Sequence, residues 1–231
     1  MKKEVLIISM LLGLCFSQTG MMTDKGESGF GIWIEANRDI ECGSIENVDI
    51  GSGDLFSTAN EYCDQTTVLS LDYMFSFGLE LGVDYGVFED ETTIVFQNGG
   101  YDDYTEEYDI TGASVSYHIK SKEGGNFFLS YKKHEMTLED SEPLRETVST
   151  SLGFYGKKKS FFELSQETVT ANGFEYDPNE YVNFGGVVKF GKGGLLIGYK
   201  IDAEAVEMAF DEEDFDYLKY GQLTLSLGGI F

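Results

Sequence analysis

The chain ends with the stretch Tyr220-Gly221-Gln222-Leu223-Thr224-Leu225-Ser226-Leu227-Gly228-Gly229-Ile230-Phe231. Leu223, Leu225 and Leu227 occupy alternate positions, and polar or small residues lie between them. Because successive side chains of a β-strand point to opposite faces, this pattern predicts a strand with one apolar and one polar face. The regular pattern continues almost to the final aromatic residue, where the chains of most soluble domains fray.

This pattern resembles the C-terminal closing strand of bacterial outer-membrane β-barrel proteins. In that family, alternating hydrophobic residues precede a final Phe, and here Leu223, Leu225, Leu227 and Phe231 match them. Gly229 departs from the family pattern, which usually has a larger apolar residue at that position. The resemblance implies insertion into the outer membrane of a Gram-negative bacterium, contact with its lipid and lipopolysaccharide, and recognition of the last strand by the barrel assembly machinery.

The composition is typical of a β-protein. The 231 residues include 18 Phe, 14 Tyr and 28 Gly but only 2 Pro, and aromatic residues favour strands while Gly favours turns. No segment has the composition of a linker between two cores, so one domain is expected. The formal net charge of −25 argues against nucleic acid as a partner, because its phosphates would be repelled.

The chain begins with the pattern of a secretory signal peptide. Met1-Lys2-Lys3 is a charged start, and Val5 to Phe16 is an apolar segment too short to span a bilayer. Cleavage is expected after Ser17. Lipoprotein processing at Cys15 is disfavoured, because Leu14 precedes it where a small residue is normally needed.

Cys42 and Cys63 are the cysteines that remain after removal of the signal peptide. An exported chain with one such pair predicts a disulfide between them, and two free thiols are the alternative.

About ten segments alternate in polarity over the length that a tilted strand needs to cross an outer membrane. The expected fold is therefore an all-β, antiparallel, up-and-down transmembrane barrel. If the weakly alternating segment Phe161 to Val169 and one neighbour belonged to a loop, the barrel would have eight strands. The expected organisation is a signal peptide at 1–17, a short periplasmic segment at 18–27 and the barrel at 28–231.

The connections between these segments alternate between short and long. Tight turns are expected near 76–78, 121–125, 156–160 and 191–194. Long connections are expected near 38–65, 89–110, 135–146, 170–180 and 203–219. This alternation matches short periplasmic turns and long extracellular loops. Within one long connection, Asn98-Gly99 favours a type I′ turn, so its strands should run out to about Gln97 and return from Tyr101.

Alternation alone does not distinguish this barrel from a soluble β-sandwich or a lipocalin-like barrel, because only the direction of the polar face differs. In a membrane barrel the charges must point inward, since a charge facing lipid near the midplane costs up to about 2–4 kcal/mol. The charged residues expected to face the lumen are Glu35, Asp72, Glu80, Asp84, His118, Lys120, Lys132, Glu163, Glu167, Lys189, Lys200 and Asp202. Their mixed signs predict a paired interior with little open water, and about ten strands argue against a wide pore.

Acidic residues gather in the long connections and lysines in the short ones. Oxygen ligands suit hard cations, so the run from Asp211 to Asp216 is a possible weak site for Ca²⁺ or Mg²⁺ shared with lipopolysaccharide. Its candidate ligands are Asp211, Glu212, Glu213, Asp214 and Asp216. A solvated acidic rim is the alternative, because no twelve-residue calcium-loop pattern is present. No other cofactor is expected.

Enzyme signatures are weak. The sequence lacks a phosphate-binding P-loop, a dinucleotide fingerprint and a nucleophile elbow. His134, followed by Glu135, is the one position comparable with the rim catalytic groups of outer-membrane proteases and lipases, but the sequence shows no orienting partners for it. The predicted function is non-enzymatic: a structural barrel or a narrow, porin-like pore with acidic extracellular loops. A rim hydrolase and a carrier of a small apolar ligand are the alternatives.

Overall fold

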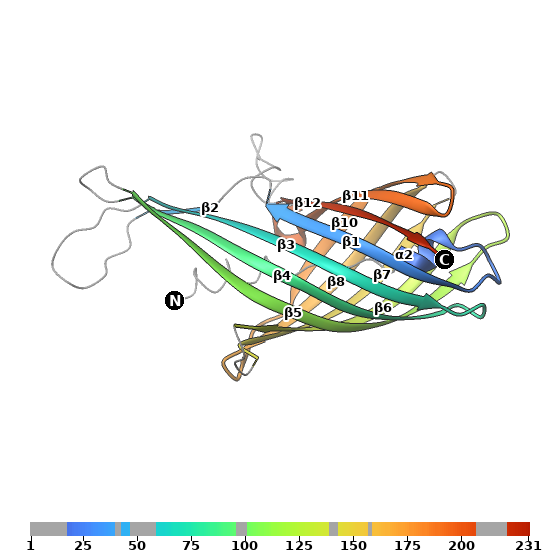
Figure 1. Ribbon diagram of the computed structural model, residues 1–231, viewed down its shortest axis with the longest axis horizontal. Coiled ribbons are helices and arrows are strands. Elements are labelled where there is room, and N and C mark those ends of the chain that lie inside the picture. Colours follow the sequence, from blue (N-terminus) through green and yellow to red (C-terminus); the bar gives the residue numbers. More distant parts are fainter. Residues whose placement is uncertain are drawn as a thin grey trace.

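The structure is a closed antiparallel β-barrel (Figure 1). It is a computed structural model that describes residues 18–39, 43–46, 59–95, 101–138, 143–156, 159–206 and 221–231. Strand β1 (Gly29–Asp39) closes the wall, because it pairs with both β3 (Ala59–Met74) and β12 (Gly221–Ile230). The other wall strands are β4 (Leu79–Val95), β5 (Tyr101–Lys120), β6 (Asn126–Thr137), β7 (Arg145–Tyr155), β8 (Ser160–Ala171), β10 (Asn179–Phe190) and β11 (Gly193–Asp202). The predicted barrel is confirmed, and it has ten wall strands, with the weakly alternating segment present as β8.

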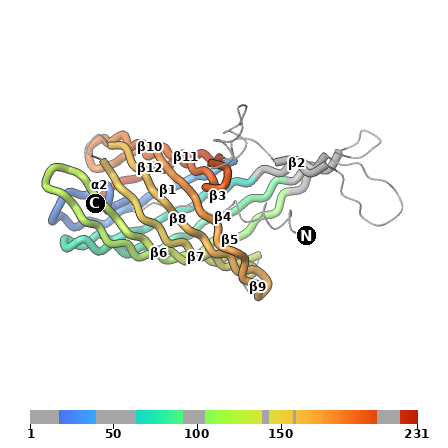
Figure 2. The backbone as a smooth tube through the Cα atoms, turned by 180° about the vertical axis from the view of Figure 1, so that it is seen from behind, coloured from blue at the N-terminus to red at the C-terminus, as the bar shows by residue number. Residues whose placement is uncertain are grey.

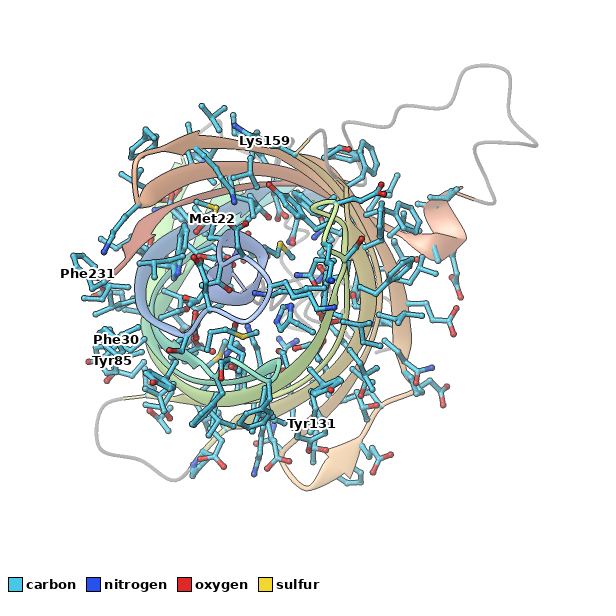
Figure 3. All side chains as sticks on the ribbon, turned by 90° about the vertical axis from the view of Figure 1, so that its right-hand side faces the viewer. Met22, Phe30, Tyr85, Tyr131, Lys159 and Phe231 are labelled. Atoms are coloured by element: carbon cyan, nitrogen blue, oxygen red, sulfur yellow. The ribbon has the colours of Figure 1, made fainter. Side chains whose placement is uncertain are left out.

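The strict alternation of side chains gives the wall an apolar outside. In β1, Ile34 is 56% exposed on the outer surface while Trp33 and Glu35 on either side of it are buried. The same parity continues around the barrel, and Figure 3 shows Phe30, Tyr85, Tyr131 and Phe231 pointing away from the lumen. A belt of exposed Leu, Val, Ile, Phe and Tyr side chains is what a lipid-facing surface requires.

One end of the barrel carries the tight turns, and we call it the short-turn end. The described turns lie at 76–78, 121–125 and 191–192, where Gly78, Gly124 and Gly191 have positive φ, and Gly156 and Lys159 lie at the same end between β7 and β8. Phe231 continues β12 there and exchanges backbone hydrogen bonds with Phe30 of 3.3 and 2.7 Å. The closing strand is therefore joined to the first strand up to its last residue.

The opposite, long-loop end extends unevenly. Figures 1 and 2 show β3, β4 and β5 running well past the other strands. Strands β4 and β5 stay paired from Leu79 to Val95, whereas β6 pairs with β5 only from Asp109 onward. At about 3.3 Å per residue, segment 101–108 projects roughly 25 Å further. This extension agrees with the predicted long hairpin, and the Asn98-Gly99 turn lies outside the described residues.

The segment predicted as a loop at 38–65 differs from expectation. It contains the short strand β2 (Gly43–Glu46), which pairs with the first residues of β3. Polar residues in β2 and in the first part of β3 give no alternation of apolar and polar positions, so periodicity does not predict these segments as strands. Their backbone groups nevertheless form a regular ladder of hydrogen bonds. At the same end, the short β9 (Phe174–Glu175) pairs with the last residues of β8.

The segment 18–27, predicted to lie in the periplasm, also differs. Its first part is the helix α2 (Gln18–Met22), all five residues of which are buried. Figure 3, viewed along the barrel from the short-turn end, shows this helix and Met22 inside the ring of strands. In the described part of the chain, no helix has the length and apolar character to cross a membrane.

Candidate functional site: the barrel lumen

Helix α2 is held inside the lumen by hydrogen bonds to the wall. The amide nitrogen of Gln18 donates to Glu35 at 2.8 Å, and its amide oxygen accepts from the Ser226 hydroxyl at 2.7 Å. The Trp33 indole nitrogen donates to the Thr19 hydroxyl at 2.9 Å. The nitrogen and the oxygen of the Gln18 amide are therefore both hydrogen-bonded, to residues of β1 and β12. These bonds fix the first turn of the helix against the two strands that close the barrel.

Glycines provide the space that the helix occupies. A Cβ on Gly31 of the wall would lie 1.7 Å from the Thr19 hydroxyl, and one on Gly194 would lie 2.6 Å from the Met22 methyl group. On the helix itself, a Cβ on Gly20 would lie 2.1 Å from His118 Nε2. Since Cβ atoms do not approach other atoms so closely, a side chain at any of these positions would require the helix or a neighbouring side chain to shift.

An apolar layer closes the short-turn half of the lumen. Met21 and Met22 of the helix pack in one buried cluster with inward-facing side chains from six strands. These wall residues are Trp33, Phe128, Tyr155, Phe161, Val187 and Leu196. These six residues occupy alternate positions that point into the lumen, where the sequence predicts polar side chains. The inward face is therefore apolar near the short-turn end and polar further along the barrel. Burial of Met21 and Met22 in this cluster stabilises α2 inside the lumen through the hydrophobic effect.

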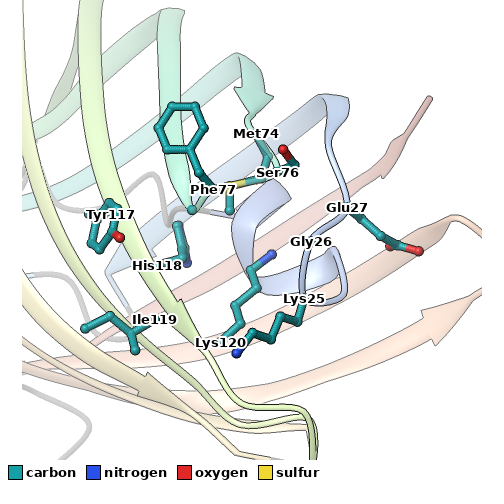
Figure 4. A pocket seen from close by; sticks show the side chains of 11 residues that line it. Lys25, Gly26, Glu27, Met74, Ser76, Phe77, Tyr117, His118, Ile119 and Lys120 are labelled. Atoms are coloured by element: carbon teal, nitrogen blue, oxygen red, sulfur yellow. The ribbon is translucent and has the colours of Figure 1, made fainter.

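Basic side chains surround the end of the helix at the short-turn mouth. Lys120 donates to the Thr23 carbonyl at 3.0 Å and Lys189 to the Met22 carbonyl at 3.1 Å. Cations are favoured beside the free carbonyl groups at a helix C-terminus. Figure 4 shows Lys120 and His118 close to Lys25 around a small pocket of about 190 Å³ between the N-terminal segment and the wall.

Above the helix lies a layer of buried, paired charges. Lys200 Nζ lies 2.9 Å from Glu167 Oε1 and 3.7 Å from the centre of the Tyr181 ring. On the other side of the lumen, Asp84 contacts His134 Nε2 at 2.9 Å and Lys132 Nζ at 3.8 Å. Ion pairs this well shielded from water fill the lumen with polar contacts.

The structure places the twelve predicted lumen charges as follows. Nine are buried in the lumen: Glu35, Asp72, Glu80, Asp84, His118, Lys132, Glu163, Glu167 and Lys200. Lys120 and Lys189 are half-buried at the short-turn mouth, and Asp202 is half-buried at the long-loop end, where it accepts a hydrogen bond from the Glu204 backbone.

Among the described residues, three buried titratable side chains were missing from that set: Asp64, His134 and Arg145. His134 was compared with rim catalytic groups, but it is 6% exposed and bonded to Asp84 within the lumen. Arg145 was assigned to a loop, although it shares the inward parity of Thr147 and Ser151 in the same strand. Extending each strand's parity to its full length would have identified all three.

A second apolar cluster lies on the inner face toward the long-loop end. It consists of Val68, Phe88, Ile110 and Met136, with Tyr108 packed against it. The lumen is therefore layered. The helix and its apolar contacts lie at the short-turn end, charged side chains lie in the middle, and the apolar side chains of β3 to β6 lie toward the long-loop end.

Several predicted sites lie outside what the structure describes. Cys42, the Cys63 side chain and the acidic run 211–216 belong to this group, so the disulfide and the divalent-cation site stay predictions. Within the described ranges, no cluster of three or more His, Cys, Asp or Glu side chains could hold a metal ion.

The chain was compared with protein families, curated proteins and solved structures. No protein-family model matches the chain, and no curated protein is significantly similar to it. The β domain of the Bordetella autotransporter BrkA is 10% identical with a TM-score of 0.45, covering 88% of this chain and 98% of that chain. The CymD monoaromatic hydrocarbon channel is 10% identical with a TM-score of 0.33, covering 95% of each chain. The apolar outer wall, the polar and plugged interior and the closed antiparallel sheet show that this chain has the fold of an outer-membrane β-barrel protein.

Proposed function

We propose that this protein is a non-enzymatic outer-membrane barrel whose lumen is closed at the periplasmic, short-turn end by helix α2. The observation that carries the proposal is the complete burial of Gln18–Met22 in a cradle of wall glycines and hydrogen bonds. A barrel closed in this way serves as a structural element that presents its long-loop end outside the cell. The projecting strands β3 to β5 and the acidic loops are then the parts that meet the surroundings.

The same geometry supports a narrow pore as a second state, reached when α2 leaves the lumen. Buried acids outnumber buried bases in the described lumen. Apart from Asp64, the acids are Glu35, Asp72, Glu80, Asp84, Glu163 and Glu167, and the bases are Lys132, Arg145 and Lys200. Since a lining of one predominant sign attracts the opposite ion, an opened lumen should favour cations.

Conductance in planar bilayers tests the closure. The wild-type barrel should give no discrete current steps. Gly20→Leu, which collides with His118 from the helix side, and Gly31→Leu, which collides with Thr19 from the wall side, should both give small cation-selective steps. Ala36→Leu is the matched control, because Ala36 lies on the exposed outer face of β1 and its variant should stay closed.

Heat-modifiable migration on a gel must first show that each variant has formed a barrel. Wild-type protein that conducts as strongly as Gly20→Leu would refute closure by the helix. Folded variants that stay silent would show that the layers above the helix close the lumen unaided.

Partners at the long-loop end are part of the same proposal. Lipopolysaccharide, bridged by Ca²⁺ or Mg²⁺ to the acidic loops, suits a strongly acidic outer rim, because divalent cations join two sets of anionic oxygen ligands. The exposed ion pair of Lys133 and Glu146, 2.7 Å apart on the outer surface, supports a polar headgroup region just above the apolar belt.

A further inference from the structure

A groove interrupts the lipid-facing wall where β10 leaves the edge of β8. It has a volume of about 580 Å³, within the range of small-molecule sites. Strand β10 pairs with β8 only as far as Gly186, while its pairing with β11 continues to Phe190. Among the described residues, the contact between these two chain segments ends with the Val187 nitrogen, which donates to the Lys159 carbonyl. Gly186 has the outward parity and carries no side chain, which leaves a hollow on the outer surface.

The hollow has an apolar lining that leads toward the middle of the membrane. Its walls are Phe184, Val188, Ile197, Tyr199 and Leu223, all with the outward parity of their strands. The strand register orders them, with Gly186 beside Ile197 and then Phe184 beside Tyr199 and Leu223. The groove thus extends from the short-turn edge into the apolar belt, along the direction in which an acyl chain lies.

A lysine stands at the short-turn mouth of this groove on a fixed turn. Lys159 has a φ of 67°, and its backbone nitrogen donates to the Gly156 carbonyl at 2.9 Å. Its carbonyl accepts from the Val187 nitrogen at 2.8 Å, which ties the turn to β10. The Lys159 side chain is exposed, and no ion pair of its ammonium group occurs among the described residues.

We propose that this groove is a binding site for one anionic phospholipid of the periplasmic leaflet, with an acyl chain in the hollow at Gly186 and the phosphate on Lys159. The position of the groove on the lipid-facing wall and the charge of Lys159 indicate this ligand. The wall faces hydrocarbon, so an acyl chain is the apolar body that meets it, and a cation at the level of the tight turns complements an anionic headgroup. The proposal depends on the lipid-facing wall and is independent of closure by α2.

Two substitutions separate the chain-binding part from the headgroup-binding part. A Cβ at Gly186 would meet only the Lys159 carbonyl at 3.6 Å, an ordinary contact, so Gly186→Leu fills the hollow without straining the backbone. Lys159→Gln removes the charge and keeps a polar side chain of similar length. The matched controls are Ala113→Leu on the outer face of β5 and Lys122→Gln in another tight turn.

The measurement is native mass spectrometry of the refolded barrel, released from mixed micelles with phosphatidylglycerol or phosphatidylcholine at equal concentration. We expect one retained phosphatidylglycerol and weaker retention of phosphatidylcholine. The loss of one lysine contact should lower phosphatidylglycerol affinity about fivefold in Lys159→Gln, and Gly186→Leu should weaken both lipids. Neither control should change retention, and millimolar inorganic phosphate should not displace the lipid, because phosphate lacks the chain.

Equal retention of the two lipids by the wild type, or retention unchanged in both test variants, would overturn the site. Displacement by inorganic phosphate alone would show a simple anion site and would also overturn it. Gel mobility before and after heating confirms that each variant is folded, so a loss of binding is not a loss of the barrel.

Discussion

The pair of Lys200 and Glu167 offers the sharpest test of whether the middle of the lumen is dry. Both side chains are nearly inaccessible, at 2% and 1% exposure, and the ammonium group also lies over the Tyr181 ring. Lys200→Met keeps the volume of the side chain and removes the charge. It leaves Glu167 as a buried carboxylate that has lost its contacting cation.

The expected cost follows from this burial. Removal of one partner of a buried ion pair costs about 3–5 kcal/mol, because the remaining charge stays desolvated. Arg145 is also electrostatically coupled to Glu167, so we expect the lower end, about 3 kcal/mol. In the double variant Lys200→Met with Glu167→Leu neither charge is left, and its stability should lie within about 1 kcal/mol of the wild type.

Reversible unfolding by denaturant in lipid vesicles measures these differences. Trp33 is the single tryptophan and is buried in the lumen, so its fluorescence reports opening of the barrel. Lys133→Met is the control, since Lys133 forms its ion pairs on the exposed outer surface, where solvent screens them and their loss should cost much less than loss of the buried pair. If Lys200→Met cost no more than Lys133→Met, the middle layer would be hydrated and the reasoning about a closed lumen would fail.

Two further predictions concern the ends of the barrel. Asp64 lies beyond the apolar belt, and burial, followed by the charge of Asp39, raises its pKa to about 8. The folded state then holds a proton that the unfolded state has released, so the free energy of unfolding should fall as the pH rises from about 4 to about 8, and Asp64→Asn should flatten this slope in denaturant titrations. The resemblance of the last strand to one recognised by the barrel assembly machinery predicts that Phe231→Ser slows assembly into membranes in cells, while refolding of the purified barrel in detergent stays within about twofold. Equal slowing of both would assign Phe231 a packing role instead.

Most of the wall could be predicted from the sequence, because period-two alternation is a local signal that a transmembrane strand must display. Leu223, Leu225 and Leu227 are exposed at 40%, 42% and 53%, on the lipid-facing side that their spacing predicts. The extended pairing of β2 with β3 could not be predicted in the same way. Outside the membrane neither face of a strand has to be apolar, so hydrogen bonding of the backbone leaves no period in the side chains.

The position of α2 could not be predicted either, because its five residues have no strong local preference that distinguishes lumen from periplasm. The helix is too short to be stable alone, and it exists because the wall surrounds it. Its stabilisation comes from residues that are distant in sequence, such as Asn126, which donates to the Gly20 carbonyl at 3.3 Å, and Ser226 on the closing strand. Pattern analysis of residues 18–27 alone therefore contains none of the information that places them.

The sequence of the wall strands nevertheless indicates that a helix lies inside the barrel. On the inward parity near the short-turn end, Trp33 and Phe128 stand beside Gly31, Gly194 and Gly153. A lumen filled with water would favour neither large apolar side chains nor gaps between them. Phe128 fills the space left by Gly153, where a Cβ would lie 2.1 Å from its ring, whereas the side chains nearest to the Cβ positions of Gly31 and Gly194 are Thr19 and Met22 of the helix. Large apolar and glycine residues mixed on the inward parity at one end of a barrel therefore predict an internal plug, and the nearest unassigned segment of chain is the first candidate to supply it.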